Sequence, residues 1–307
     1  MKPSLTPLRY PGGKSRLLGY VKEFLKSNGI SPDIIVEPYA GSASISVGLL
    51  QRSIVHSAQI CEKDPLIIAY WNAIKFHFED FVESIKAVDV SMDTWFAFKK
   101  YLSEDAWKKF SATELALAFL FYNRTNYSGI IKGGPLGGKS QISPYKLGCR
   151  FNKSAIIEKL VSLNRIAENI QVIRGDGLKF MKEEAANSSC KNMFFYVDPP
   201  FYKAGKELYR EFFKDEDHIN LASFLANLDY PWLLSYDNSE FIRNLYKEKR
   251  NAKIYTDYQA NLLKKSESEL LFSNRAIPPG STAVNFKYSP ALNFDLSHTL
   301  KKNAIIS

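Results

Sequence analysis

The alternation of short apolar runs with helical patterns constrains the fold of this chain of 307 residues more than any other feature. Residues 34–37 form a β-branched run closed by a proline, and residues 58–61 form a second apolar run that ends on Glu62. Helical patterns follow these runs at 45–50 and 66–76. Further strand-like runs lie at 170–173, 193–197, 232–236, 254–258 and 270–273, the last two as a candidate antiparallel hairpin. Strands that alternate with helices are typical of a parallel sheet, so the sequence predicts an α/β fold.

The alternation is interrupted in the middle of the chain. Residues 80–122 carry helical patterns, and residues 123–150 are rich in Gly, Asn, Ser and Pro, which predicts irregular structure. We therefore expect a discontinuous α/β domain, residues 1–78 and 160–307, interrupted by a mostly helical domain over 79–159.

Several classes of protein are excluded at this stage. No run approaches the about 20 apolar residues of a membrane span, and the N-terminus has no signal-peptide hydrophobic stretch. The cysteines, Cys61, Cys149 and Cys190, are odd in number and widely separated, so they favour neither a disulfide framework nor a zinc site. The histidines show no metal-ligand spacing. We expect a metal-free protein of the cytoplasm that does not associate with membranes.

The fully apolar run 193–197 leads directly into Asp198, Pro199, Pro200 and Phe201. Ligands of open α/β sheets bind at the carboxyl ends of strands, so Asp198 is well placed for chemistry. The prolines fix the backbone and leave the Pro199 carbonyl without a helical partner. One carboxylate, one carbonyl and an aromatic face suit an exocyclic amine on a planar base, because the two acceptors take its two hydrogens while the ring stacks. A capping Asp and a Pro-Pro turn would explain the same residues without chemistry.

A loop with a single glycine, residues 37–43, follows the first strand and opens a helix. Gly41 permits close backbone approach, and the helix N-terminus offers free N–H groups. A dinucleotide fingerprint has three glycines, so NAD(P) fits poorly. Glu62, at the end of the second strand, is where an acid could bind ribose hydroxyls. Ordinary turn chemistry is the alternative.

Residues 133–140 match the phosphate-loop pattern GxxxxGK[ST]. A working phosphate loop follows a strand and leads into a helix, whereas residues 141–148 cannot form that helix. A flexible basic loop fits better than an ATP site built on Lys139.

Positive charge is concentrated around this loop. The formal net charge is +9, and the stretch between Glu114 and Glu158 holds no acid. Its bases are Arg124, Lys132, Lys139, Lys146, Arg150 and Lys153. Tyr127 and Tyr145 are interleaved with them, as in surfaces that contact both phosphates and bases. The stretch indicates a polyanionic partner; a solvated loop with a chance excess of charge is the alternative.

Four motifs in this order resemble the Dam-type N6-adenine DNA methyltransferases: LRYPGGK at 8–14, VEPYAGS at 36–42, NRTNYSG at 123–129 and DPPF at 198–201. LSYDN at 234–238 and SELL at 268–271 are similar to the closing motifs of that family. The resemblance covers nearly the whole chain. It implies a Rossmann-like, S-adenosylmethionine-dependent methyltransferase sheet, in which 79–159 is an inserted DNA target-recognition domain. It also implies double-stranded DNA as partner and admits a cognate restriction endonuclease.

The resemblance assigns roles to individual residues. Donor contacts fall to Tyr10, Lys14 (facing the donor carboxylate), Glu37 and Gly41 (methionine side), Glu62 (ribose), Asp176 (adenine) and Asp198. Asp198 would also hold the target amine together with the Pro199 carbonyl. Phe201 departs from the more common Tyr but keeps the stacking face. Tyr127 would be a wedge in the DNA stack, with Arg124 contacting a base or phosphate. The rest of the expected DNA surface consists of Asn126, Lys132, Lys139, Lys146 and Arg150.

The implied activity is site-specific methylation of adenine N6 in DNA. The target base cannot be reached inside a duplex, so it would be flipped out at a cost of a few kcal/mol. Methylation of cytosine N4 shares the same amine chemistry and stays open. A phosphate-loop ATPase and a DNA-binding protein without catalysis are alternatives of other classes.

Overall fold

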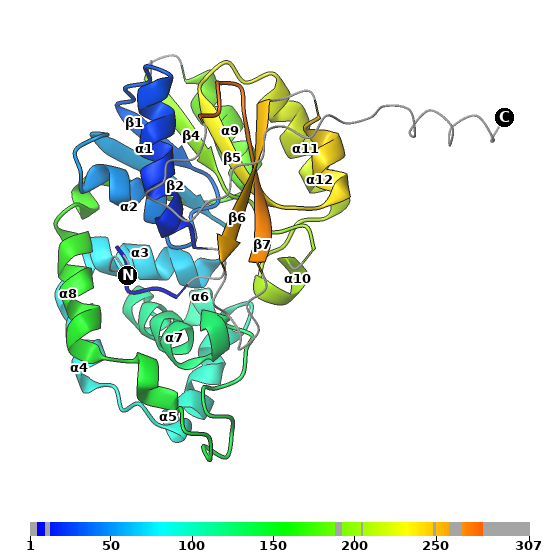
Figure 1. The fold of residues 1–307 in the computed structure, drawn as a ribbon. Coiled ribbons are helices and arrows are strands. Elements are labelled where there is room, and N and C mark those ends of the chain that lie inside the picture. Colours follow the sequence, from blue (N-terminus) through cyan, green and yellow to red (C-terminus); the bar gives the residue numbers. More distant parts are fainter. Residues whose placement is uncertain are drawn as a thin grey trace, which may run out of the picture.

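The computed structural model describes residues 5–9, 13–187, 192–203, 205–247, 250–257 and 266–278, and its centre is one seven-stranded sheet (Figure 1). The strands are β1 (Ile34–Glu37), β2 (Ser57–Glu62), β3 (Ile170–Arg174), β4 (Met193–Val197), β5 (Trp232–Asp237), β6 (Arg250–Asp257) and β7 (Ser266–Ser273). They lie in the order β3-β2-β1-β4-β5-β7-β6. The first five strands in the chain run parallel, and β7 is antiparallel to both β5 and β6. The predicted α/β sheet and terminal hairpin are confirmed. Tyr258 and Cys190 lie outside the described residues.

Helices cover both faces of the sheet, which is why its strands are apolar runs. All five residues of β4 are buried, and they alternate between two hydrophobic clusters because successive side chains point to opposite faces. Phe194 and Tyr196 belong to the cluster on one face, whereas Phe195 and Val197 belong to the cluster on the other.

The first cluster is completed by helices from the N-terminal part of the chain. They are η1 (Lys14–Leu17), α1 (Leu18–Ser27), α2 (Ser44–Leu50) and α3 (Pro65–Phe76). The second cluster is completed by later helices. They are α9 (Gly177–Ala186), α11 (Asp215–Ala226) and α12 (Glu240–Leu245).

The helices of the expected insertion gather at one end of the sheet, below it in Figure 1. They are α4 (Phe78–Ala87), α5 (Met92–Ala97), η2 (Phe98–Leu102), α6 (Ala106–Lys109), α7 (Ala112–Thr125) and α8 (Lys153–Asn164). The central helix, α7, begins at a capping box between Ser111 and Glu114 and packs on α3. Its buried side chains belong to the same cluster as one face of the sheet, so the insertion shares a core with the α/β part. The expected boundary after residue 159 falls within α8.

The sequence predicts irregular structure over 123–150, whereas α7 continues to Thr125 and the almost entirely irregular stretch runs over 126–152. The helical turns within residues 126–152 are only η3 (Tyr127–Gly129) and η4 (Leu147–Arg150). A further short turn, η5 (Ala167–Asn169), follows α8 and precedes β3. Within the part of the chain that the structure describes, no helix is long and apolar enough to cross a membrane.

Candidate active site

A cavity lies at the carboxyl ends of the parallel strands, where the sequence places its candidate acids. Among the described residues, seven carboxylate residues line it, namely Glu37, Glu62, Asp64, Asp176, Asp198, Glu211 and Asp217. The cationic residues of its described lining are three: Lys14, Lys63 and Arg210. The acids come from the ends of four different strands and from the segment after β4, so distant parts of the sequence meet here. The excess of carboxylates favours a ligand that is cationic and rich in hydrogen-bond donors.

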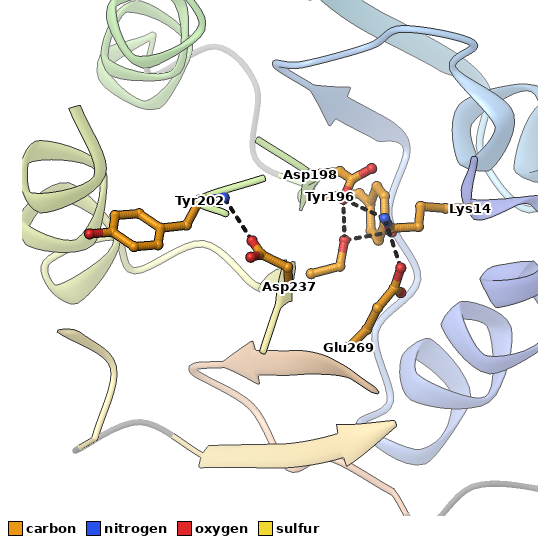
Figure 2. A network of polar contacts seen from close by, with 7 residues as sticks. Lys14, Tyr196, Asp198, Tyr202, Asp237 and Glu269 are labelled. Atoms are coloured by element: carbon orange, nitrogen blue, oxygen red, sulfur yellow. Dashed lines mark hydrogen bonds and ion pairs between the residues drawn. The ribbon is translucent and has the colours of Figure 1, made fainter. Parts of the chain in front are cut away.

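Asp198 stands at the end of β4 in a polar network (Figure 2). Its Oδ1 accepts a hydrogen bond from Ser235 Oγ at 2.7 Å and lies 3.0 Å from Lys14 Nζ. The same ammonium lies 3.3 Å from Glu269 Oε1 on β7 and 4.9 Å from the ring centroid of Phe201. Burial raises the pKa of Asp198, and the Lys14 ammonium opposes this rise by favouring the carboxylate. Lys14, expected at the donor carboxylate, is therefore placed against the Asp198 carboxylate.

Glu37 is the last residue of β1 and is buried. Its Oε2 accepts hydrogen bonds from Ser46 N at 3.0 Å and Ser46 Oγ at 2.5 Å, at the start of α2. Burial raises the pKa of Glu37 to about 8, against the opposing effect of these hydrogen bonds. A buried carboxyl group in a cavity whose pKa lies near neutrality is a candidate functional residue.

The glycine loop is held by the end of β2. Gly41 adopts a φ of +48°, which favours glycine, and its N–H donates to Glu62 Oε2 at 3.0 Å. Glu62 Oε1 accepts from the backbone N–H groups of Lys63 and Asp64 at 2.8 and 3.2 Å. Burial raises the pKa of Glu62 to about 7. Its carboxylate thus organises two loops and lines the cavity.

Asp176 follows β3, caps α9 by accepting from Lys179 N at 2.9 Å, and lines the cavity. The next residue, Gly177, permits a close approach, since a Cβ there would meet Pro38 O at 2.5 Å. The glycine in this position therefore lets the start of α9 pack against the loop after β1. Tyr10, the remaining expected donor contact, lies outside the described residues.

The segment after the DPPF motif is fastened at two places. Asp237, at the end of β5, accepts hydrogen bonds from the backbone N–H groups of Tyr202 and Lys203 at 2.7 and 3.1 Å (Figure 2). Further along, Arg210 Nε lies 3.3 Å from Asp64 Oδ2, so the segment reaches across to the start of α3. Sequence reasoning did not identify this bridging segment, because its partners lie on other elements: Asp237 of β5 is 35 residues beyond Tyr202, and Asp64 precedes α3.

Most of the expected DNA surface is exposed, on the irregular stretch beside the cavity. Tyr127 is 50% exposed, and Lys139, Lys146 and Arg150 are exposed as well. Lys132 is also exposed and donates to the carbonyl of Tyr209, a residue of the cavity lining. The basic stretch therefore adjoins the candidate active site.

Two expected DNA contacts have structural roles instead. Asn126 is buried: its amide nitrogen donates to the carbonyls of Ile130 and Ile131, and its oxygen accepts from Trp95 Nε1 at 2.7 Å. Arg124 is partly buried and donates to the Pro7 carbonyl at 2.9 Å, and burial lowers its pKa to about 10. Both side chains lie at the N-terminal end of the basic stretch, where Asn126 contacts Trp95 of α5 and Arg124 contacts the segment that precedes η1.

The alternative of a phosphate loop at 133–140 lacks its structural context. No strand precedes this stretch and no α-helix follows it before α8, as the fully described residues 126–152 demonstrate. Among the residues the structure describes, no group of three or more His, Cys, Asp or Glu side chains could hold a metal ion.

Ser235, Asp237 and Glu269 belong to the site, although no role was expected for them from the sequence. In the sequence they fall within the stretches 234–238 and 268–271 that resemble closing motifs of a known family, and each is a polar residue inside or at the end of an apolar strand run. Such a residue has to be satisfied by a partner on a neighbouring element.

A mostly parallel sheet with an acid-lined cavity at its carboxyl ends is the Rossmann-like fold of S-adenosylmethionine-dependent methyltransferases. The model of the D12 class N6 adenine-specific DNA methyltransferases matches residues 10–261, and the chain belongs to that family. The resemblance drawn from the four motifs is thereby confirmed.

Individual relatives are distant. The Type II methyltransferase M.CviBI of Paramecium bursaria Chlorella virus NC1A is 24% identical over 261 residues, which are 84% of this chain and 90% of that protein. Two solved structures of the rRNA methyltransferase aviRa from Streptomyces viridochromogenes are 13% and 14% identical. Both match over 87% of each chain, with TM-scores of 0.38 and 0.37.

Proposed function

We propose that this chain transfers a methyl group from S-adenosylmethionine to the N6 amine of an adenine that is flipped out of double-stranded DNA at a specific site. The observation that carries the proposal is the Asp198 carboxyl group at the end of β4, which lies 3.0 Å from the Lys14 ammonium and lines an acid-rich cavity. Membership in the D12 class family supports adenine in DNA as the target. The reaction would take place in the cytoplasm, where both substrates lie.

The residues of the cavity fit S-adenosylmethionine. The donor carries an ammonium, a sulfonium, two ribose hydroxyls and an adenine amine, all of which seek acceptors or negative charge. Glu37 would face the ammonium, Glu62 the ribose hydroxyls and Asp176 the adenine amine. The carboxylates of Glu37 and Glu62 have raised pKa values of about 8 and about 7, so a cationic ligand would draw them toward the ionised form.

Bound S-adenosylmethionine would supply an electrophilic methyl group on a sulfonium. The chain has to present the amine to it, and adenine N6 is a poor nucleophile because its lone pair is delocalised into the ring. Asp198 and the Pro199 carbonyl would each accept one amine hydrogen, which favours a pyramidal nitrogen and directs its lone pair. Positioning of this kind can supply several kcal/mol of the barrier.

Phe201 would stack on the flipped base. Its ring already lies over the Lys14 ammonium at 4.9 Å and edge-on to Tyr209 at 6.1 Å, so the aromatic face is held in place. The cation beside the ring also opposes the rise that burial causes in the pKa of Asp198. A phenylalanine in place of tyrosine retains the stacking surface, and the proposal needs no hydroxyl there.

The stretch from residue 127 to 150 would bind the DNA. Tyr127 is a candidate wedge, and the exposed lysines and Arg150 would contact phosphates. Because this exposed basic stretch lies within residues 79–159, we assign those residues as the target-recognition insertion. We do not include Asn126 among the DNA contacts, because its amide forms hydrogen bonds with Trp95 and with the Ile130 carbonyl.

Expression in a methylation-free host, followed by sequencing that maps N6-methyladenine, tests the activity and yields the target site. Methyl groups on adenine within one short motif are expected, and their loss in Asp198→Ala with DNA binding retained. Methylation of cytosine N4, or full activity of Asp198→Ala, would overturn the proposal. The mapped motif also tests a cognate restriction endonuclease as partner, which would cut only the unmethylated form.

A further inference from the structure

Strand β5 supplies two polar side chains to the loop that carries Asp198. In the parallel register Val197 pairs with Leu234, so the next residues along, Asp198 and Ser235, meet at the strand ends. Ser235 is fully buried, and its hydroxyl lies 2.7 Å from Asp198 Oδ1. The second side chain, Asp237, lies two residues further along the same strand.

The direction of the hydrogen bonds around Ser235 follows from the groups involved. A hydroxyl has one hydrogen, and an ionised carboxylate only accepts, so Ser235 donates to Asp198. The other contact of Ser235 Oγ is the hydroxyl of Tyr196 at 3.0 Å, which must then be the donor. Tyr196 is itself buried within β4, so the chain from Tyr196 to Ser235 to Asp198 is anchored in the sheet core (Figure 2).

Both stabilising contacts of Asp198 use the same oxygen. Oδ1 receives the Ser235 hydroxyl and the Lys14 ammonium, and within the described part of the chain no hydrogen bond to Oδ2 is found. The side chain retains 21% exposure and lines the cavity. Oδ2 is therefore the oxygen available to a substrate amine, and the contacts at Oδ1 fix the plane of the carboxylate.

Asp237 fixes the backbone of the same loop. Its two carboxylate oxygens accept the N–H groups of Tyr202 and Lys203, and Lys203 Nζ donates to the Asn238 carbonyl at 2.7 Å. These contacts hold the residues directly after Phe201. Side chain and backbone of the loop are thus both held by β5, at Asp198 and just beyond Phe201.

We propose that Ser235 and Asp237 are positioning residues for methyl transfer: Ser235 orients the Asp198 carboxylate, and Asp237 holds the loop that carries it. The inference rests on the proposed function. Neither side chain is required to touch the donor or the DNA, so their loss should slow the transfer step and leave binding of both substrates unchanged.

The test compares Ser235→Ala, Ser235→Thr and Asp237→Asn with the wild type on duplex DNA carrying the mapped target. Single-turnover rates are measured with tritium-labelled S-adenosylmethionine, and the Kd values for donor and DNA by calorimetry. A misplaced reacting group costs up to about 100-fold in rate. We expect Ser235→Ala to be about 10- to 100-fold slower than the wild type, with both Kd values within about twofold of the wild-type values. Ser235→Thr should recover most of the rate, because it keeps the hydroxyl. The rate of Asp237→Asn should lie between those of Ser235→Ala and the wild type.

Ser273→Ala is the matched control. Ser273 is also fully buried in this sheet, but its hydroxyl donates to the Trp232 carbonyl at 2.5 Å, away from Asp198. Its rate should equal that of the wild type. Equal rates for Ser235→Ala and wild type, or equal losses for Ser235→Ala and Ser273→Ala, would overturn the inference. If Ser235→Ala does not fold, Asp237→Asn and Ser235→Thr still decide. A wild type that methylates no adenine contradicts the proposed function itself.

Discussion

Replacing Lys14 by methionine removes the one ammonium that lies between two carboxylates. Its Nζ is 3.0 Å from Asp198 and 3.3 Å from Glu269, and the side chains of Lys14, Asp198 and Glu269 are 4%, 21% and 4% exposed. Methionine keeps an unbranched side chain as far as Cε and lacks only the terminal ammonium position, so the charge is the main change. We expect the variant to be destabilised strongly, because two buried carboxylates would then face each other without their shared cation.

The magnitude follows from burial. Removing one partner of a buried ion pair costs about 3–5 kcal/mol, and we expect a loss in that range at pH 8. Burial already raises the pKa of Asp198 and Lys14 opposes the rise, so without Lys14 the pKa goes higher. A group with a raised pKa in the folded state loses its contribution to stability as the pH rises through that pKa. Uptake of a proton by Asp198 relieves part of the repulsion between the two carboxylates, so the loss should be smaller at pH 6 than at pH 8.

Urea unfolding at the two pH values, each compared with wild type at the same pH, measures both quantities. The control is Lys63→Met, since the pair between Lys63 and Glu211 is 63% and 43% exposed and such pairs contribute less than about 1 kcal/mol. A loss for Lys14→Met that is no larger than the control, or that does not change with pH, would refute the reasoning.

Three further outcomes are expected. Burial raises the pKa of Glu37 to about 8, so the contribution of Glu37 to stability is lost as the pH rises from about 4 through 8. Glu37→Gln should therefore be about 2–4 kcal/mol more stable than the wild type at pH 8 and equal to it at pH 4, as measured by thermal or urea unfolding. Neutralising three lysines of the basic stretch should reduce the slope of log K for DNA against log salt by up to about 3, with the Kd of the donor unchanged. These lysines are Lys132, Lys139 and Lys146. The exposed Lys22 and Lys26 of α1, changed to glutamine, should leave the slope as it is. Removing the α7 cap with Ser111→Ala should cost about 1 kcal/mol in urea unfolding, and a stability equal to wild type would contradict the capping argument.

The parts of the fold that could be predicted from the sequence are those encoded locally. A strand buried on both faces is an apolar run wherever it lies in the sheet, so β1 and β4 are visible as such. Acids directly after such runs are then expected on one edge of the sheet, and the cavity does gather Glu37, Glu62 and Asp198.

The order of the strands could not be predicted in the same way. Ser235 contacts Asp198 only because β5 lies beside β4, and Glu269 reaches Lys14 only because β7 turns back antiparallel beside β5. The burial of Asn126 could not be predicted either. A polar residue in a basic stretch is expected to be exposed, whereas the Asn126 amide forms hydrogen bonds with Trp95 and with the Ile130 carbonyl. Long-range partners of polar side chains have no local pattern, and they decide which residues of a motif reach a ligand.

The cavity also explains how a site of this kind selects its ligand. Burying Glu37 and Glu62 costs stability at neutral pH, as their raised pKa values of about 8 and about 7 record. A neutral ligand of the same size would leave that cost in place. A cationic ligand that donates hydrogen bonds offsets this cost, because it stabilises the ionised carboxylates. Such a ligand also stabilises the folded protein, in proportion to the logarithm of the ligand concentration divided by Kd. S-adenosylmethionine and its demethylated product differ in that the donor carries the sulfonium charge. The donor should therefore raise Tm more than the product does at equal concentration. Glu37→Gln should reduce the rise for both ligands, because both carry the ammonium that Glu37 would face. An equal rise for both ligands would mean that the carboxylates do not sense the charge.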